Sequence, residues 1–300
     1  MKTLYIDCFS GISGDMTLGA LLDMGVAESV LRDGLDKLGL SDGFVLRVER
    51  GQKMGIIGTK VSVDLVRLED AHTHADGTSH NHGDTHEHTH ADGTTHSHDH
   101  DGDGEHHQDT HEDTHQKHTH TPETRRNLPE ISRIIRQSGL SENIKTHALA
   151  IFNSLAEAES HVHGVPAEQV HFHEVGGVDA LVDIVGSAIC MEALGVAQVA
   201  AGPVHVGSGM VKTEHGVFPV PAPATLELLR GVPVYAGDTR GELVTPTGAA
   251  ILSHYAGHFG SMPALVPERV AYGIGQKDFN IPNCVRFVLC DMEDLSTKKA

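Results

Sequence analysis

Basic side chains are scarce in this chain of 300 residues, in which 22 Lys and Arg stand against 41 Asp and Glu. The formal net charge of -19 repels a phosphate backbone and an anionic lipid surface. We therefore expect neither nucleic acid nor a membrane among the partners. The same charge attracts cations, which are the better candidates.

Cysteines are few and long apolar runs are missing. Cys8, Cys190, Cys284 and Cys290 are scattered without a C-x-x-C pair, which argues against a disulfide framework and a thiolate zinc site, so we expect free thiols in the core. The most apolar stretches, such as ALVDIVGSAICMEALGV, are interrupted by acids. The amino end, MKTLYIDCFSG, lacks the pattern of a signal peptide, so the expected location is the cytoplasm.

One segment, residues 69–124, has almost no apolar side chains. It holds 16 of the 25 histidines, and its HTHADGT heptapeptide occurs at His72 and again at His88. Because it has so little to bury, we expect it to be a disordered linker. It divides an amino-terminal unit, residues 1–68, from a main unit, residues 125–292, that we expect to pack with it as one domain; residues 293–300 form a tail.

Histidines in this linker recur as H-x-H pairs among acidic residues. Imidazole suits nickel, copper and zinc, and the carboxylates add charge compensation. The alternative, a plain solvated linker, does not require so many imidazoles. The predicted metal ligands here are His72, His74, His80, His82, His86, His88, His90, His96, His98, His100, His106 and His107.

The remaining sequence alternates between strand and helix patterns, which predicts a mixed α/β fold. Strands are expected at KTLYIDCF, FVLRVER, GTKVSVDLV, AQVAAGPVHVG, ERVAYGIG and NCVRFVLCD. Helices are expected at TLGALLDMGV, NLPEISRIIRQSG, SENIKTHALAIFNSLAEAESHVHG, VDALVDIVGSAICMEALG, PATLELLR and TPTGAAILSHYA. The strand order does not follow from these patterns.

Two histidines flank a phenylalanine in VHFHEVGG. If this stretch is a short strand, alternation puts His171 and His173 on one face and Phe172 on the other. With Glu174 at the following turn, the pair suits a metal site or proton transfer. His163, near the end of the preceding helix, is a further candidate ligand, although a favourable charge at a helix carboxyl end explains it nearly as well.

Asp179 and Asp183 lie four apart in the helix that follows. Residues with this spacing share a helix face, where two carboxylates repel each other unless a cation or a donor lies between them. We therefore add both aspartates to His171, His173 and Glu174 as candidate catalytic residues. The competing interpretation is placement in the first helical turn, where acids favour the helix dipole.

Two turns have the composition of anion-binding loops. In SGISGDM, Ser10, Gly11, Ser13 and Gly14 stand between strand and helix, where backbone N–H groups attract phosphate or carboxylate. Asp7 and Asp15 beside them are candidate metal ligands. In TPTGAA, Thr245, Thr247 and Gly248 form either an anion site or a simple helix cap.

Taken together, five stretches resemble the LarC family of nickel insertion proteins. In chain order they are DCFSGISGDMTLGALLDMGV, HVHGVPAEQVHFHEVGGVDALVDIVGSAICMEALGV, GSGMVKTEHGVFPVPAPAT, GELVTPTGAAIL and YGIGQKDFNIPNCVR. The resemblance runs from residue 1 to about residue 290 and is interrupted by the histidine-rich segment.

The resemblance implies a lyase-type nickel insertase of nickel-pincer cofactor biosynthesis. Its substrate would be pyridinium-3,5-bisthiocarboxylic acid mononucleotide, with nickel(II) inserted to form a sulfur-carbon-sulfur pincer. CTP with Mg²⁺ or Mn²⁺ would drive the reaction through a cytidylylated substrate. Members of the family typically continue into a CTP-binding domain, which we expect as a separate chain or a frameshift product. The resemblance leaves open whether the chain forms a homo-oligomer.

Three other functions remain open beside insertion. A nickel or zinc storage protein or metallochaperone would need only the histidine-rich segment. A metal-dependent hydrolase would use the histidines and carboxylates to activate water. A subunit without catalysis would act as a scaffold for the CTP-binding domain.

Overall fold

The computed structural model describes residues 1–40, 43–66, 88–89, 95–96, 126–170, 172, 177–213 and 216–291. A mixed seven-stranded sheet, in the order β13-β6-β1-β15-β14-β3-β2, forms the centre of the unit built by residues 1–66 and the residues after 122. The mixed α/β prediction is confirmed.

The first strand of the described chain pairs along its whole length with the last strand at the middle of the sheet. β1 (Lys2–Asp7) runs antiparallel to β15 (Cys284–Asp291) and parallel to β6 (Gln198–Ala201), which pairs with β13 (His258–Phe259). On the other side follow β14 (Pro267–Ile274), β3 (Ile56–Leu65) and the edge strand β2 (Phe44–Lys53). The sheet therefore joins segments from both sides of residues 69–124.

Shorter strands form separate pairs outside the main sheet. β7 (Val204–His205) pairs with β11 (Val234–Tyr235), β8 (Gly207–Ser208) with β12 (Gly241–Glu242), and β9 (Met210–Thr213) with β10 (Gly216–Pro219). In the unit of residues 67–122, β4 (His88–Thr89) pairs with β5 (Thr95–His96). No helix among the described residues is long and apolar enough to cross a membrane.

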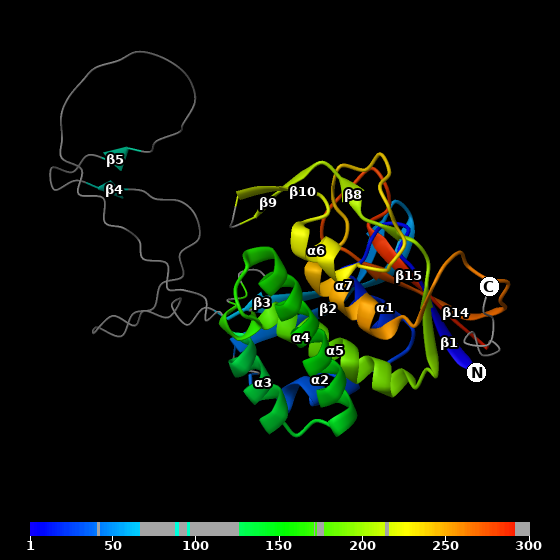
Figure 1. Ribbon diagram of the computed structural model, residues 1–300, viewed down its shortest axis with the longest axis horizontal. Helices are drawn as coiled ribbons and strands as arrows, with labels where there is room; N and C mark the ends of the chain where they lie inside the picture. The colour runs from blue at the N-terminus through cyan, green and yellow to red at the C-terminus, as the bar shows by residue number, and fades with distance from the viewer. Residues whose placement is uncertain are drawn as a thin grey trace, which may run out of the picture. The chain divides into compact units, whose positions relative to one another are not determined.

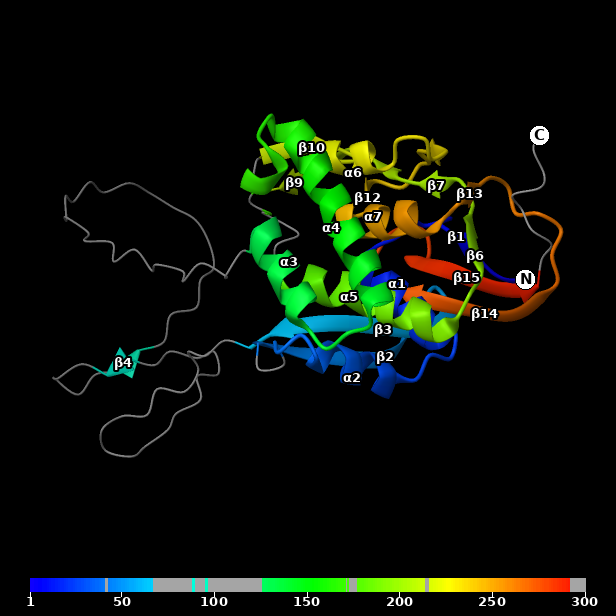
Figure 2. The same ribbon diagram turned by 60° about the horizontal axis from the view of Figure 1, so that its bottom comes forward.

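Helices pack in layers against the sheet and against one another. α1 (Gly14–Asp23) contacts β14 and β3 and is covered by α5 (Val178–Leu194). α4 (Glu142–His163) packs on α5 and lies beside it in both views (Figures 1 and 2). α2 (Glu28–Asp36), α3 (Leu128–Gln137), the 3₁₀ turn η2 (Ala167–Gln169), α6 (Pro223–Leu228) and α7 (Pro246–Tyr255) complete the fold.

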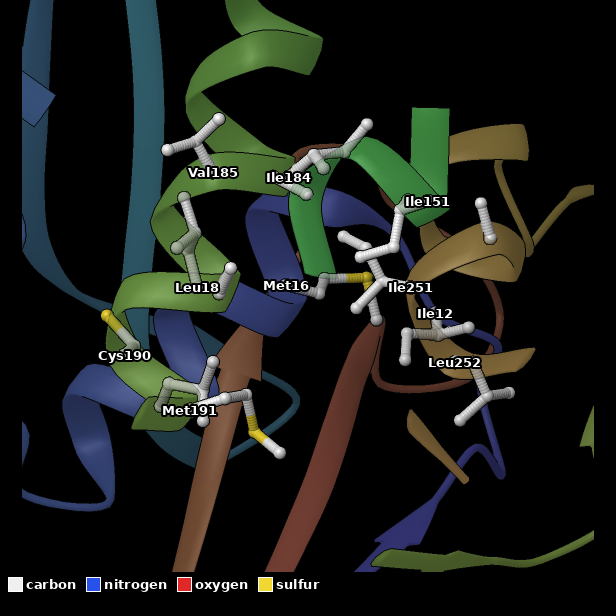
Figure 3. Close-up of a cluster of buried hydrophobic side chains, with 14 of the residues drawn as sticks. Ile12, Met16, Leu18, Ile151, Ile184, Val185, Cys190, Met191, Ile251 and Leu252 are labelled. Carbon is white, nitrogen blue, oxygen red and sulfur yellow. The ribbon is translucent and has the colours of Figure 1, made fainter. Parts of the chain in front are cut away.

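The main core fills the space between these helices. Figure 3 shows side chains from α1, α4, α5 and α7 that meet in it, among them Met16, Ile184 and Ile251. Helix α1 is buried on nearly every side, because the sheet covers one face and α5 another. The helix expected at TLGALLDMGV is therefore found as part of α1, in an almost fully buried position.

Local signals account for several helix ends. Asn127 and Glu130 form a capping box at the start of α3, with Glu130 N donating to Asn127 Oδ1 at 3.0 Å. Ser141 caps α4, which ends at Gly164 in the left-handed conformation. These bonds satisfy backbone groups that a helix end leaves unpaired, so the sequence places both helices well.

Candidate functional site: a pocket at three helix starts

A pocket of 360 Å³ opens where α1, α5 and α7 begin. This volume lies in the range of small-molecule sites. It is lined by Ser13, Gly14 and Asp15 from the start of α1, Asp179 and Asp183 from α5, Thr245, Pro246 and Thr247 from the start of α7, Val61, Ser62 and Val63 from β3, and Glu242 and Gln276. Two regions that the sequence analysis treated separately, SGISGDM and the aspartate pair, thus face one cavity.

Asp15 is held in a fixed orientation at the first turn of α1. Its Oδ1 atom accepts hydrogen bonds from Ser13 Oγ and from the Met16 amide, the latter at 2.9 Å. Burial raises the pKa of Asp15, while the hydrogen bonds from Ser13, Met16 and Gln276 oppose that rise. The carboxylate is therefore preorganised and faces the pocket with little freedom to turn.

Asp183 is the most strongly perturbed acid of the pocket. Burial, followed by the charges of Asp15 and Asp179, raises its pKa well above the usual range. Its Oδ1 atom is buried, and none of the described residues donates a hydrogen bond to it. A Cβ on Gly14 would lie 2.2 Å from Asp183 Oδ2, so only a glycine at the start of α1 leaves room for this carboxylate.

The other acids of the pocket differ in environment. Asp179 is exposed and lies in the first turn of α5, the position on which the helix-dipole interpretation rests. Glu242 Oε2 lies 3.6 Å from Lys277 Nζ, and Gln276 Nε2 donates to Val61 O at 2.8 Å. Glu242 and Gln276 were not selected from the sequence, because each lies in a loop or a two-residue strand without a recognisable spacing.

Other predicted site residues are not among those that line this pocket. Asp7, a predicted metal ligand, instead accepts hydrogen bonds from the Arg286 guanidinium, including Nε at 3.1 Å. Ser10 is fully buried, and its hydroxyl has no partner among the described residues. A Cβ on Gly11 would lie 2.0 Å from Leu243 O, and one on Gly248 would lie 2.3 Å from Ile12 O. These two glycines allow backbone segments to approach each other.

Helix α7 begins as its sequence predicts. Thr245 is the N-cap and its Oγ1 accepts from Gly248 N at 3.2 Å, with Pro246 in the first turn. Thr245 and Thr247 also line the pocket. Capping and an anion-binding role are therefore both compatible with this helix start.

His163 ends α4 and has a local partner. Its Nε2 atom lies 3.2 Å from Glu159 Oε2, one turn earlier. His171, His173 and Glu174 lie outside the described residues, as do the predicted ligands of the histidine-rich segment apart from the backbone of β4 and β5. Phe172 is 1% exposed and its ring centroid lies 6.4 Å from that of Phe152. Neither Val170 nor Phe172 belongs to a strand, so the strand predicted there is not found at these two positions.

The described residues contain no group of three or more His, Cys, Asp or Glu side chains arranged to hold a metal ion.

All four cysteines are buried and free, as predicted. Burial raises the pKa of Cys190 to about 12 and that of Cys284 to about 11, which keeps these thiols protonated and unreactive.

A second titratable cluster joins α4 to α7. His147 Nδ1 and His254 Nε2 lie 2.8 Å apart, a contact that requires one donor and one acceptor ring. Burial and then the neighbouring His147 lower the pKa of His254. The folded protein therefore holds His254 neutral at a pH where the unfolded chain would already bind a proton there.

We expect this pair to make stability fall as the solution is acidified. A lowered folded-state pKa contributes stability above the unfolded value of about 6.5, and that contribution is lost as the pH falls toward the folded pKa. The free energy of unfolding, measured by urea denaturation from pH 7.5 to 5.5, should drop more steeply for the wild-type protein than for His254→Asn. The exposed His258 provides the control, since His258→Ala should keep the wild-type slope. Equal slopes for wild type and His254→Asn would contradict the assignment.

Comparison with known proteins now adds to this geometry. The profile of a family described as "Nickel insertion protein" matches residues 4–300. This chain belongs to the nickel insertion protein family. The resemblance inferred from the five sequence stretches is thereby confirmed.

Among relatives of this nickel insertion family member, the "Pyridinium-3,5-bisthiocarboxylic acid mononucleotide nickel insertion protein" of Desulfitobacterium hafniense is 42% identical over 98% of this chain and 60% of its own length. The protein of that name from Clostridium acetobutylicum is 43% identical over 98% of this chain and 65% of its own. A "Putative nickel insertion protein" of Dictyoglomus thermophilum is 38% identical over 100% of this chain and 63% of its own length. No solved structure matches significantly. The chain spans about three fifths of the length of these curated relatives.

Proposed function

We propose that this protein binds nickel(II) and takes part in its insertion into pyridinium-3,5-bisthiocarboxylic acid mononucleotide. The observation that carries the proposal is the family match over residues 4–300, together with relatives named for this reaction at 42% identity over 98% of the chain. The pocket at the starts of α1, α5 and α7 supports it, since its volume and polar lining suit a small charged substrate.

Nickel is the cargo of this reaction, and the protein must release it to the substrate. Nickel(II) accepts imidazole nitrogen and prefers soft sulfur donors to carboxylates, so a pair of thiocarboxylates can take it from histidines. We propose that the 16 histidines of residues 69–124 collect the ion and raise its local concentration. His171 and His173, with His163 and Glu174, would then form the transfer site.

Asp179 and Asp183 are the proposed catalytic residues that the structure describes. Both line the pocket with Asp15, and the three carboxylates attract the cationic pyridinium ring of the substrate. Ser13, Gly14, Thr245 and Thr247 occupy the starts of α1 and α7, where backbone N–H groups favour the phosphate of a mononucleotide.

CTP with Mg²⁺ or Mn²⁺ is the proposed driving reactant of a lyase-type insertase. We propose that a carboxy-terminal CTP-binding domain completes the activity.

The test is transfer of nickel from the purified, nickel-loaded chain to the dithiolated pyridinium nucleotide with CTP and Mg²⁺. Product is followed by mass, with and without the carboxy-terminal domain of a relative as a second protein. Product that requires the added domain is the expected result. Product from the chain alone would place a nucleotide site within these 300 residues, whereas nickel that stays bound in both cases would contradict the proposal.

Nickel or zinc storage is the second candidate function, and the histidine content of residues 69–124 favours it. A storage protein needs no ordered site. Substitutions at Asp15 or Asp183 would then leave metal release unchanged, whereas an insertase should lose transfer.

A further inference from the structure

The pocket concentrates negative charge without a basic neighbour in its lining. Asp15, Asp179 and Asp183 face it from two helices, and none of the described residues that line it is Lys, Arg or His. Asp15 and Asp179 lie in the first turns of α1 and α5, where the dipole lowers the cost of an anion, whereas Asp183 lies one turn further into α5. Glu242, the fourth acid of the lining, has Lys277 Nζ 3.6 Å away, but Asp15, Asp179 and Asp183 still repel one another, so they need a compensating cation or proton.

An unsatisfied atom points to a ligand rather than to simple dipole compensation. Asp183 Oδ1 is buried beside the pocket and receives no hydrogen bond from the described residues. Ser187 lies one turn further along the same face of α5, is 0% exposed, and also has an unpartnered hydroxyl. Buried polar atoms normally have a hydrogen-bond partner. Two buried atoms without one, a single helical turn apart, therefore point to a bound water or ion.

The donor types narrow the choice of ion. Carboxylate and hydroxyl oxygens suit hard cations such as Mg²⁺ and Mn²⁺, whereas nickel and zinc favour imidazole and thiolate. The described residues hold no ready set of three or more metal-binding side chains. Mg²⁺ does not require one, because it keeps several waters and is commonly held by one or two carboxylates.

We propose that Asp15 and Asp183, with Asp179 at the rim, hold a hydrated divalent cation of the Mg²⁺ or Mn²⁺ type in this pocket. One or two carboxylate oxygens bind the ion directly, and in the absence of substrate its remaining waters reach Ser13, Thr247 and Gln276 across the cavity. This site differs from the nickel-collecting histidines in ligand type, and it does not depend on the proposed insertion reaction.

Asp15 and Asp183 have separate roles in this arrangement. Ser13 and the Met16 amide fix Asp15 through its Oδ1 atom, so it presents a directed ligand. Asp183 instead rests against the start of α1, where Gly14 leaves room for it, and its buried oxygen is the one that lacks a partner. A cation between them satisfies that oxygen and removes the repulsion at once.

Thermal unfolding of the full chain tests the proposal. A ligand raises the melting temperature only if it binds the folded state better than the unfolded chain, so ions bound alike by both states do not contribute. At a Mg²⁺ concentration a hundred times the dissociation constant, the wild-type midpoint should rise by about 5 °C or more. NaCl at equal ionic strength is the reference, because general screening acts in both solutions.

Asp183→Asn is the decisive variant, since it keeps the shape of the side chain and removes its charge. Without Mg²⁺ it should melt above the wild-type protein, because repulsion from Asp15 and Asp179 is relieved. Adding Mg²⁺ should raise the melting temperature of this variant only slightly. Asp33→Asn, an exposed change of equal charge on α2, should retain the full wild-type response.

Counting bound Mn²⁺ by electron paramagnetic resonance provides a second readout. The wild-type chain and Asp33→Asn should bind one more ion than Asp183→Asn or Asp15→Asn, which also covers the case in which one variant fails to fold. The proposal is overturned if Mg²⁺ leaves the wild-type midpoint unchanged, if Asp183→Asn responds equally, or if the Mn²⁺ counts agree.

Discussion

Replacing Gly273 with alanine is expected to prevent folding or to lower the free energy of unfolding by about 3 kcal/mol or more. A Cβ at this position of β14 would lie 1.7 Å from Met16 O and 2.7 Å from Ala20 N, both backbone atoms of α1. Neither atom can rotate away as a side chain can. The helix must move off the sheet, and the core between α1 and α5 then loses its packing.

The matched control for this prediction is Gly257→Ala. Its Cβ would meet nothing within 4 Å, and its backbone N–H, which donates to Val199 O at 3.0 Å, is retained. The control should change stability by less than about 1 kcal/mol. Both variants are compared with the wild-type protein by urea unfolding. A Gly273→Ala midpoint equal to that of the control would show that α1 does not rest on β14 as described.

Local sequence signals predicted the elements that depend on local bonds. The ends of α3 and α4 follow from Asn127, Ser141 and Gly164, each of which satisfies a backbone group within one turn. The sheet order depends instead on the pairing of β1 with β15, whose strands are nearly the whole described chain apart. A short stretch of sequence carries no sign of such long-range pairing, so the strand order could not be predicted.

Glycines illustrate the same limit from the side of packing. Gly11 and Gly248 were selected from the sequence as parts of anion-binding loops. In the fold, a Cβ on Gly11 would meet Leu243 O and one on Gly248 would meet Ile12 O, so each glycine also allows a close approach to a distant backbone carbonyl. A glycine needed for packing and a glycine needed for a ligand look identical in one sequence. The packing requirement becomes visible only in the fold.

The pocket shows how much of a site a sequence can supply. Asp15, Asp179 and Asp183 were all selected as candidates, from one glycine-rich turn and one helix spacing. That α1 and α5 begin at the same cavity depends on α5 packing over α1, which no spacing reveals. Asp7 had a similar sequence context to Asp15, yet it points to Arg286, because it is the last residue of β1 rather than a helix start.

Replacing both His171 and His173 with alanine is expected to lower nickel transfer to the pyridinium nucleotide at least about 10-fold. The physical reason is that a delivery site must hold nickel more selectively than the many exchanging ligands of residues 69–124, which requires at least two imidazoles at a fixed spacing. Phe172, which lies between the two histidines in the sequence, is buried, and its ring centroid lies 6.4 Å from that of Phe152.

Two measurements separate loss of transfer from loss of fold or of total nickel. Thermal unfolding should be unchanged in the double variant, because neither substitution removes the buried Phe172 ring, and equilibrium dialysis should still find most of the nickel bound by residues 69–124. His258→Ala, which removes an exposed histidine on β13, should transfer nickel at the wild-type rate. If the double variant transfers nickel as fast as this control, the histidines of residues 69–124 deliver the ion directly, and a fixed relay at residues 171 and 173 is unnecessary.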